Sequence, residues 1–304
     1  MLQQTRATVV IPYFERWLLL FPDVASLAKA PLETVIKAWE GLGYYSRARN
    51  LHKGAQQIAI QFGGKIPSKP EDLALIKGLG PYTIAAILSF GFKQRSAPVD
   101  GNVTRVIARY FSIEENVCKQ AVKRKIARAT ESLLDPHEPW ITAEALIELG
   151  ATLCTPKPRC NGCPLQKTCL GQDKAESLPI KNKGIETTSL KRAVAVIESE
   201  GKILVKKGEV GKVMEGLYEF PYFEMGKERW GQSQTIRAIK KAFGFPVQII
   251  APLPTVIHTF TRFKASLYPI RCTTPIAKPV PGYQWIARSQ LSALPFSSGH
   301  RRIL

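Results

Sequence analysis

The chain has no apolar run that reaches the roughly 18–20 residues of a membrane-spanning helix. Its start, Met1-Leu2-Gln3-Gln4, lacks the basic stretch and apolar core of a signal peptide. We therefore expect a cytoplasmic protein without a membrane partner. Acidic residues are also few: 24 Asp and Glu stand against 43 Lys and Arg, which gives the 304 residues a net charge of +19. This excess favours a polyanionic partner, because Lys and Arg displace counterions from phosphates; a generally basic proteome is the alternative.

The texture of the sequence changes twice along the chain. To about residue 153 apolar residues recur with the spacing of amphipathic helices, whereas from Arg192 they alternate as in β-strands. Residues 154–170 are rich in Pro and Cys, and residues 171–189 are polar, as in a linker. The length allows two domains. We predict an all-α domain at 1–153, a loop at 154–170, a linker at 171–189 and an α+β domain at 190–304.

The densest signal lies between residues 76 and 105. Gly78 and Gly80 flank a single residue and are followed by Pro81, which suits the first turn of a helix. This pattern predicts a tight turn between two helices, with backbone amides exposed beside a helix N-terminus, where a phosphate can bind. Asp100 follows later and precedes an apolar helical pattern. By itself it fits either a helix cap or a functional carboxylate.

Four of the six cysteines form the pattern C-x5-C-x2-C-x5-C, at Cys154, Cys160, Cys163 and Cys169. The prolines between them prevent regular structure, and a reducing cytosol disfavours disulfides, so a metal is the natural occupant of this loop. Zinc usually takes two close cysteine pairs, whereas one C-x2-C between lone cysteines suits an iron–sulfur cluster. Zinc and a metal-free loop stay open. We expect Cys118 and Cys272 to be ordinary buried thiols.

Together, the turn, the aspartate and the cysteine loop resemble the endonuclease III-like helix–hairpin–helix superfamily of DNA glycosylases. The words M-L-Q-Q-T at 1–5 and G-L-G-Y-Y-S-R-A-R-N-L-H at 41–52 are similar specifically to the adenine DNA glycosylase (MutY) family, and the match runs to Cys169 and more loosely to the end. The resemblance implies a monomeric base-excision-repair enzyme with a [4Fe–4S] cluster. It would hydrolyse the N-glycosidic bond of adenine opposite 8-oxoguanine or guanine in double-stranded DNA. The family's first cysteine gap is six residues; here it is five.

The resemblance also assigns chemical roles. Asp100 would stabilise the positive charge that develops on the sugar as the bond breaks, and Asn102 would hold that carboxylate or a nearby phosphate. Tyr82 stands where strand-cutting relatives carry a lysine that forms a Schiff base. Because a phenol cannot form one, we expect a monofunctional enzyme. The alternative, a pyrimidine-lesion glycosylase and lyase of the endonuclease III type, is disfavoured.

Base-recognition residues are implied by the same family words. Gln3 and Gln4 resemble glutamines that enter the duplex when the target base flips out. Tyr44 resembles a tyrosine wedged beside 8-oxoguanine, and Glu144 a carboxylate that contacts the flipped adenine.

The second domain contains G-L-Y-E-F-P at 216–221, which resembles Nudix-type folds. The acidic Mg²⁺-binding box that should follow is missing from 222–230, so we do not expect pyrophosphatase activity. The family reads 8-oxoguanine through a Phe-Ser-His loop, and Phe260, Thr261 and Arg262 occupy that place here. The resemblance therefore implies a Nudix-like DNA-recognition domain, and both domains would close around duplex DNA.

One element of the family pattern is missing from this sequence. The family's catalytic acid is a glutamate two residues before the methionine of M-L-Q-Q-T, and the sequence starts at that methionine. We expect the chain as given to bind lesion DNA but to release adenine slowly, since general acid catalysis contributes about 10²–10⁴-fold. The missing glutamate has two explanations: an internal methionine was taken as the start, or the protein is a catalytically impaired DNA-binding protein. The upstream codons would distinguish the two.

Overall fold

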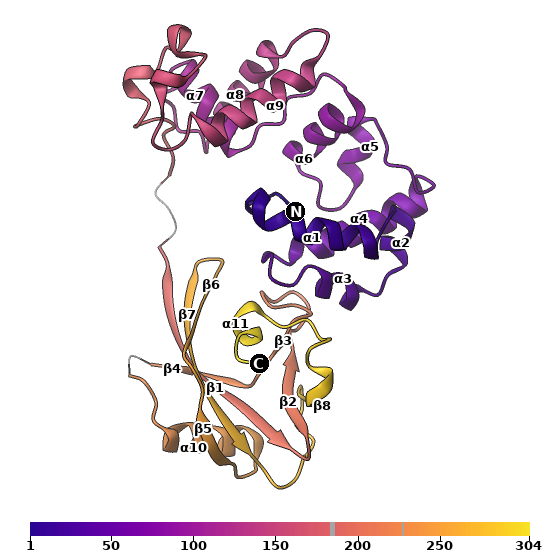
Figure 1. The fold of residues 1–304 in the computed structure, drawn as a ribbon, viewed down its shortest axis with the longest axis vertical. Helices are drawn as coiled ribbons and strands as arrows, with labels where there is room; N and C mark the ends of the chain where they lie inside the picture. Colours follow the sequence, from indigo (N-terminus) through magenta and orange to yellow (C-terminus); the bar gives the residue numbers. More distant parts are fainter. Residues whose placement is uncertain (183–185, 227) are drawn as a thin grey trace. The chain divides into compact units, whose positions relative to one another are not determined.

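A computed structural model of the chain describes residues 1–182, 186–226 and 228–304. Its contacts divide the protein into two compact units: Gln57–Gly184, and Met1–Gln56 together with Ile185–Leu304. The predicted order of an all-α part followed by an α+β part is confirmed (Figure 1). The two units nevertheless cut across the predicted boundary near residue 153, because the first helices pack with the C-terminal part. Within the described ranges, no helix has the length and apolar character needed to cross a membrane.

The unit Gln57–Gly184 consists of short helices around one apolar core. Its elements, after the end of α4 (Ser46–Gln61), are α5 (Pro70–Leu75), α6 (Pro81–Ala86), a π-helix (Ile87–Gly91), α7 (Gly101–Tyr110), α8 (Gln120–Leu133), α9 (Pro139–Thr152) and three 3₁₀ turns (Cys160–Gly162, Gln166–Thr168, Gln172–Lys174). The core joins Val103 and Ile107 of α7 to Ile126 of α8 and Leu146 of α9. Its buried side chains recur at helical spacing, as predicted.

Part of the predicted linker 171–189 packs against this unit. Ala175 and Leu178 are buried, and a Cβ added at Gly171 would lie 2.4 Å from the carbonyl oxygen of Arg109. The Val117 N–H donates to the carbonyl of Ile180 at 3.0 Å. Residues 183–185 of the predicted linker lie outside the described residues, and the first sheet strand begins at Thr188. Polar composition had concealed these few apolar contacts.

The N-terminal helices α1 (Ala7–Leu20), α2 (Val24–Lys29), α3 (Leu32–Ala38) and the start of α4 enclose a core that includes Trp39 and Leu217. α1 has no side-chain cap at its start. On α4, Leu51 is exposed, whereas His52 is buried and contacts the carbonyl of Ala30 at 3.0 Å. Leu217 explains why the helices and the C-terminal part form one unit.

Ion pairs reinforce the packing of these helices on the C-terminal part. Glu40 accepts from the Arg301 Nε at 2.7 Å and from the Phe296 N–H at 2.9 Å. Arg49 lies 3.7 Å from the Glu215 carboxylate and donates to its carbonyl at 2.9 Å. Because Glu40 is mostly buried, it depends on these partners.

The C-terminal part is a mixed sheet, as predicted from the alternating pattern. Its strands are β1 (Thr188–Ser199), β2 (Lys202–Lys207), β3 (Tyr218–Glu219), β4 (Tyr222–Met225), β5 (Gln248–Pro252), β6 (Val256–Phe260), β7 (Phe263–Thr273) and β8 (Gln284–Ala287). The strand order is β3-β2-β1-β7-β5, while β4, β6 and β8 pair with β1, β7 and β2. β1 and β2 form an antiparallel hairpin, whereas β1 and β7 run parallel.

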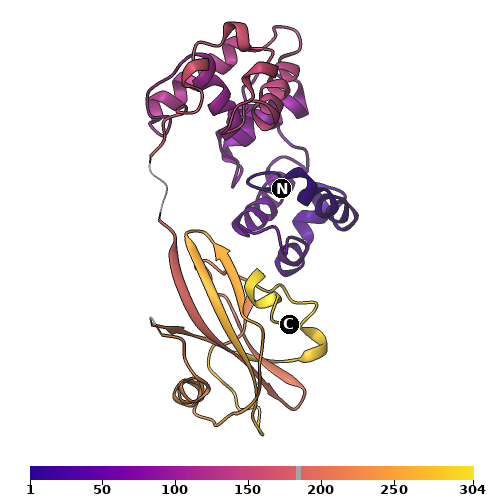
Figure 2. The same cartoon turned by 60° about the vertical axis from the view of Figure 1, so that its left-hand side comes forward.

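The two faces of the sheet are covered by different helices. Along β1, Val194 and Val196 face the core closed by the segment before α11 (Ser298–Arg301), whereas Ala195 and Ile197 face α10 (Gln232–Phe243). Figure 2 shows α10 and α11 on opposite sides of the sheet. The alternation of apolar residues on both faces follows from the period of two in a strand.

Candidate active site

The tight turn between α5 and α6 has the predicted form. Gly78 adopts a φ of 90°, which side-chain-bearing residues rarely adopt. Pro81 occupies the first turn of α6, and a Cβ at Gly80 would meet no atom within 4 Å. The Lys77 N–H donates to the Gln57 side chain at 2.6 Å, which fixes the turn from α4. The turn is therefore fixed by α4 at Lys77 and has open space beside Gly80.

Asp100 caps the N-terminus of α7. Its Oδ1 accepts from the N–H groups of Asn102 and Val103, both at 2.8 Å, so the cap predicted as one possibility is present. The amides and the positive helix end stabilise a carboxylate anion there. Tyr82 lies close by: burial raises the pKa of its phenol, and the charge of Asp100 raises that pKa further. The structure thus brings together a carboxyl group held by two amides and a phenol whose pKa is raised.

Asn102 holds Asp100 through its backbone, whereas its side chain is engaged elsewhere. The Asn102 Oδ1 accepts from the Arg105 Nη2 at 2.9 Å. Arg105 also donates to the carbonyl of Gly150 at 2.8 Å and, through Nε, to that of Cys154 at 2.7 Å. A Cβ at Gly150 would lie 2.7 Å from the Cβ of Asn102, so α9 packs tightly on the start of α7. Arg105 therefore ties the capping turn to the cysteine loop.

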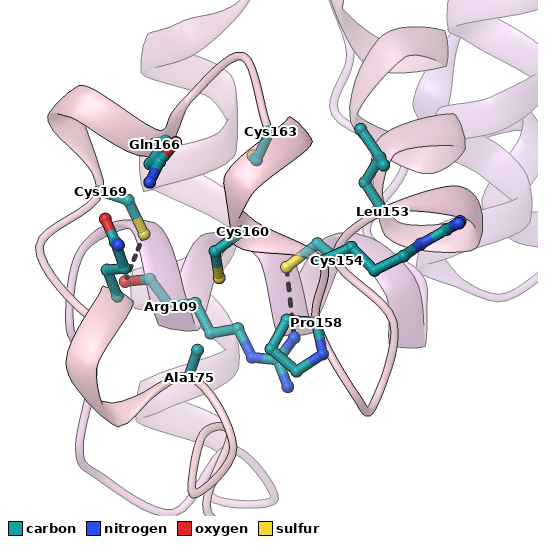
Figure 3. A pocket seen from close by; sticks show the side chains of 11 residues that line it. Arg109, Leu153, Cys154, Pro158, Cys160, Cys163, Gln166, Cys169 and Ala175 are labelled. Atoms are coloured by element: carbon teal, nitrogen blue, oxygen red, sulfur yellow. Dashed lines mark hydrogen bonds between the residues drawn. The ribbon is translucent and has the colours of Figure 1, made fainter.

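Four cysteine side chains line one pocket after α9 (Figure 3). They are Cys154, Cys160, Cys163 and Cys169. Burial raises the pKa of the Cys169 thiol, and the other three cysteines add to this shift. Within the described residues no group of three or more His, Cys, Asp or Glu is already gathered as a metal site. The thiols share a pocket without closing around a common centre.

Arg109 is the buried basic group at this pocket. Its Nη1 lies 3.3 Å from the Cys154 Sγ and donates to the carbonyl of Thr155 at 2.7 Å, and its Nε donates to the carbonyl of Leu178 at 3.0 Å. Figure 3 shows the contact with Cys154 as a dashed line. Hydrogen-bond donors to thiolate sulfur stabilise negative charge, so the donor set fits a thiolate-bound cluster. The signal in the sequence was a basic residue on the apolar face of α7.

Two of the predicted DNA-contacting residues of the other unit, Gln3 and Tyr44, contact Arg47. This half-buried guanidinium donates to the carbonyls of Met1 at 3.0 Å, Leu42 at 3.1 Å and Gly43 at 3.2 Å, and also to that of Gln3. It therefore holds the chain start and the loop before α4 together. Arg47 lies within the family-like stretch at 41–52, but the sequence alone indicated no role for it.

Two residues next to these carbonyls have a strained backbone. Gln4 and Tyr44 have φ values of 58° and 47°, in the left-handed region that costs side-chain-bearing residues free energy and is common at functional sites. Tyr44 is 53% exposed, and the Arg47 guanidinium lies 5.8 Å from its ring centre. Tyr44 is therefore an exposed aromatic ring on a strained backbone next to the Arg47 guanidinium.

The predicted recognition triplet forms the tip of the β6–β7 hairpin. Phe260 and Phe263 pair across the turn, and Thr261 has a φ of 47°. The Arg262 guanidinium lies 5.2 Å from the ring centre of Phe263, and the Arg262 carbonyl accepts from the Thr188 N–H at 2.8 Å. The two-residue turn holds the Thr261 and Arg262 side chains at the end of a rigid ribbon.

The remaining predicted residues are distributed over both units. Glu144 lies exposed on α9, in the unit that also contains the Gly-x-Gly turn, Tyr82 and Asp100. The glutamines at the chain start, Tyr44 and the β6–β7 tip belong to the other unit. The predicted buried state is confirmed for Cys272 but wrong for Cys118, which is exposed just before α8.

Comparisons with known proteins agree with this arrangement. Residues 1–132 match the family of HhH-GPD superfamily base excision DNA repair proteins, and residues 192–304 match the NUDIX domain. The chain is similar to the solved structure of a thermostable thymine-DNA glycosylase, at 26% identity and a TM-score of 0.51, over 57% of this chain and 80% of that one. A trapped endonuclease III–DNA covalent intermediate has the same fold over the same shares, at 23% identity and a TM-score of 0.51.

Relatives of known name match most or all of the chain. Adenine DNA glycosylase of Rattus norvegicus is 31% identical over 100% of this chain and 69% of the rat protein. The protein of the same name from Buchnera aphidicola of Acyrthosiphon pisum is 30% identical over 90% of this chain and 77% of its own length. Both the helical and the Nudix-like parts thus have matched counterparts, in the order observed here. The chain therefore belongs to the adenine DNA glycosylase family of helix–hairpin–helix base-excision-repair proteins.

Proposed function

We propose that this protein hydrolyses the N-glycosidic bond of adenine paired with 8-oxoguanine or guanine in duplex DNA, without cutting the strand. The observation that carries the proposal is the carboxylate of Asp100, which the first amides of α7 hold at 2.8 Å beside Tyr82. Membership of the adenine DNA glycosylase family supports DNA as the substrate.

Asp100 would act by electrostatics. Breaking the bond leaves positive charge on the deoxyribose, and a fixed anion beside it lowers the energy of that state. Oδ1 is held by two amides, while Oδ2 has no hydrogen-bond partner among the residues that the structure describes. One oxygen thus orients the group and the other can face the sugar.

Tyr82 supports hydrolysis by water. A lysine in this position could attack the sugar and form a Schiff base, whereas a phenol cannot. Because burial and the charge of Asp100 raise its pKa, Tyr82 stays neutral and can donate a hydrogen bond beside the carboxylate. The enzyme would then release the base and leave the DNA strand intact.

The four pocket cysteines would hold a [4Fe–4S] cluster. When bound, the cluster would supply four iron–thiolate bonds that fix the shape of the loop. Two observations support this: Arg109 donates toward the Cys154 sulfur, and Lys157, Arg159 and Lys167 are exposed on the loop. These cations would contact DNA phosphates.

Recognition of the damaged pair would come from the other unit. Tyr44 would stack beside 8-oxoguanine, and Gln3 and Gln4 would fill the space left by the flipped adenine. Thr261 keeps the hydroxyl of the family loop, and Arg262 places a cation at the hairpin tip. Binding by a monomer would suffice, and sedimentation of the protein with and without DNA tests that state.

The test is release of adenine from duplexes that differ only in the opposite base. We expect faster release opposite 8-oxoguanine or guanine than opposite thymine, by the 304-residue chain and by the chain extended through its upstream codons. Asp100→Asn should abolish release while keeping lesion binding. Asp135→Asn is the matched control, because Asp135 also accepts two backbone N–H groups, at 2.8 and 2.7 Å, before α9.

Two outcomes would overturn the proposal. Adenine release by Asp100→Asn at the rate of Asp135→Asn would show that the carboxylate has no part in the chemistry. Efficient trapping of a covalent enzyme–DNA adduct by borohydride would show that an amine attacks the sugar.

A further inference from the structure

The solvent side of α8 carries an unusual concentration of positive charge. A shallow hollow of about 400 Å³ is lined there by Ala121, Arg124, Lys125 and Arg128. These residues follow the i, i+3, i+4, i+7 spacing of one helix face, and they lie opposite the buried residues Val122, Ile126 and Thr130. The cations therefore point away from the core and contribute nothing to its packing.

The charges of α8 oppose the stability of the helix. Lys119 stands at its N-cap without a side-chain cap bond, Lys123 lies in its first turns, and the first turn has no acidic residue. Cations near the positive end of a helix are unfavourable. Arg124 and Arg128, four residues apart, repel each other as well. Departures from local rules of this kind are expected at binding surfaces.

Few acidic groups compensate these charges. Lys125 forms an ion pair with Glu115 at 2.8 Å, and both side chains are about half exposed, at 54% and 51%. Exposed pairs of this kind contribute little and exchange readily. In the part of the chain that the structure describes, Arg124 and Arg128 have no carboxylate within ion-pair distance. Even Glu131, in the next turn of α8, forms no ion pair with them.

We propose that this face of α8 is a second phosphate-binding surface, which contacts the backbone of duplex DNA separately from the Gly-x-Gly turn and the cysteine loop. A helix rises about 1.5 Å per residue, so Arg124 and Arg128 lie roughly 6 Å apart along the axis. A shallow hollow with cations in a row fits a linear polyanion, whereas a small anion would need an enclosed site. The inference rests on the proposed function only for the choice of DNA as the polyanion.

The test is the salt dependence of binding to an undamaged duplex. The variant is Arg124→Gln with Arg128→Gln in the full chain. Each lost phosphate contact reduces the slope of log K against log salt by about 0.9, so the slope should fall by up to about 1.8. A fourfold rise in salt should then weaken the variant about 10-fold less than the wild type. The matched control is Lys240→Gln with Lys241→Gln, two exposed cations of α10.

Further readouts separate this surface from the lesion site. The ratio of affinities for lesion and undamaged duplexes should not change in the α8 variant, and its thermal midpoint should stay equal or rise, because repulsion is relieved. An unchanged slope, a slope change equal to that of the α10 control, a lowered midpoint, or tighter binding to RNA than to DNA duplexes would each overturn the inference. Failure of adenine release would refute the proposed function but leave this slope measurement intact.

Discussion

Replacing Arg47 with methionine should uncouple DNA recognition from the rest of the fold. Methionine keeps the apolar stem but removes the guanidinium, which donates to four backbone carbonyls around the chain start and the loop before α4. No carboxylate lies within ion-pair distance of Arg47 in the described residues, and burial lowers the pKa of its guanidinium. The guanidinium therefore positions the backbone through hydrogen bonds and not through an ion pair.

The magnitude follows from these contacts. Four hydrogen bonds contribute about 1 kcal/mol each net of water. The buried Nε without a partner and the burial of the charge offset roughly 1–3 kcal/mol of this. We expect a loss of about 1–3 kcal/mol in the free energy of unfolding. Gln4 and Tyr44 would also lose their order, and restoring it on binding costs about 1–2 kcal/mol per residue. Affinity for lesion DNA should fall roughly 30- to 1000-fold.

The assay is fluorescence anisotropy with duplexes that contain adenine opposite 8-oxoguanine or opposite thymine. Arg49→Met is the matched control. Arg49 lies two residues after Arg47 on α4 but donates at 2.9 Å to the carbonyl of Glu215 instead. Both variants should melt at lower temperature, but only Arg47→Met should lose preference for the lesion duplex. Equal lesion preference in the two variants would refute the role of Arg47 as a positioning residue.

Three other substitutions test separate parts of the structure. Gly80→Ala should leave the melting temperature unchanged, because its Cβ meets open space, yet it should lower DNA affinity about 10- to 100-fold by blocking a charge-assisted amide contact. Gly91→Ala, where an added Cβ also meets open space, is the control, and equal DNA affinities of the two variants would contradict the phosphate role of the turn. Cys163→Ser should lose iron, visible absorbance and DNA affinity together, whereas Cys118→Ser should lose none, and stoichiometric zinc without iron in the wild type would refute the cluster. Glu40→Gln should lower the free energy of unfolding by about 2–3 kcal/mol, because it weakens charged hydrogen bonds to α11. Differential scanning calorimetry would detect this as a melting midpoint lower by roughly 5–10 °C, and an unchanged midpoint would contradict it.

Local patterns in the sequence were sufficient for much of the fold. Pro81 after Gly80 predicted the start of α6, and the alternation from Arg192 predicted a strand. That both faces of this strand are buried emerged only from the structure. Asp100 before an apolar helix predicted a cap. These features depend on residues close together in the chain, whose steric and hydrogen-bonding preferences are the same in any context.

Some local inferences failed because burial is a tertiary property. Helical spacing groups Leu51 with the buried residues Ala55 and Ile58, yet Leu51 is exposed while its neighbour His52 is buried. Ala175 and Leu178 were assigned to a linker, yet they are buried against the unit that contains α7. Composition over a window cannot show that two apolar side chains reach a distant core.

The positioning arginines could be identified only in the folded structure. The sequence by itself determined the motif residues, the charge excess and the succession of an all-α part by an α+β part. Only the tertiary structure showed that Arg47 donates to the carbonyls of Gln3 and Gly43, which directly precede the strained residues Gln4 and Tyr44. It also showed that Arg105 joins the turn after Asp100 to the carbonyl of Cys154. Each of these guanidiniums bonds to backbone carbonyls, which every residue carries, and so the partners leave no mark in the sequence.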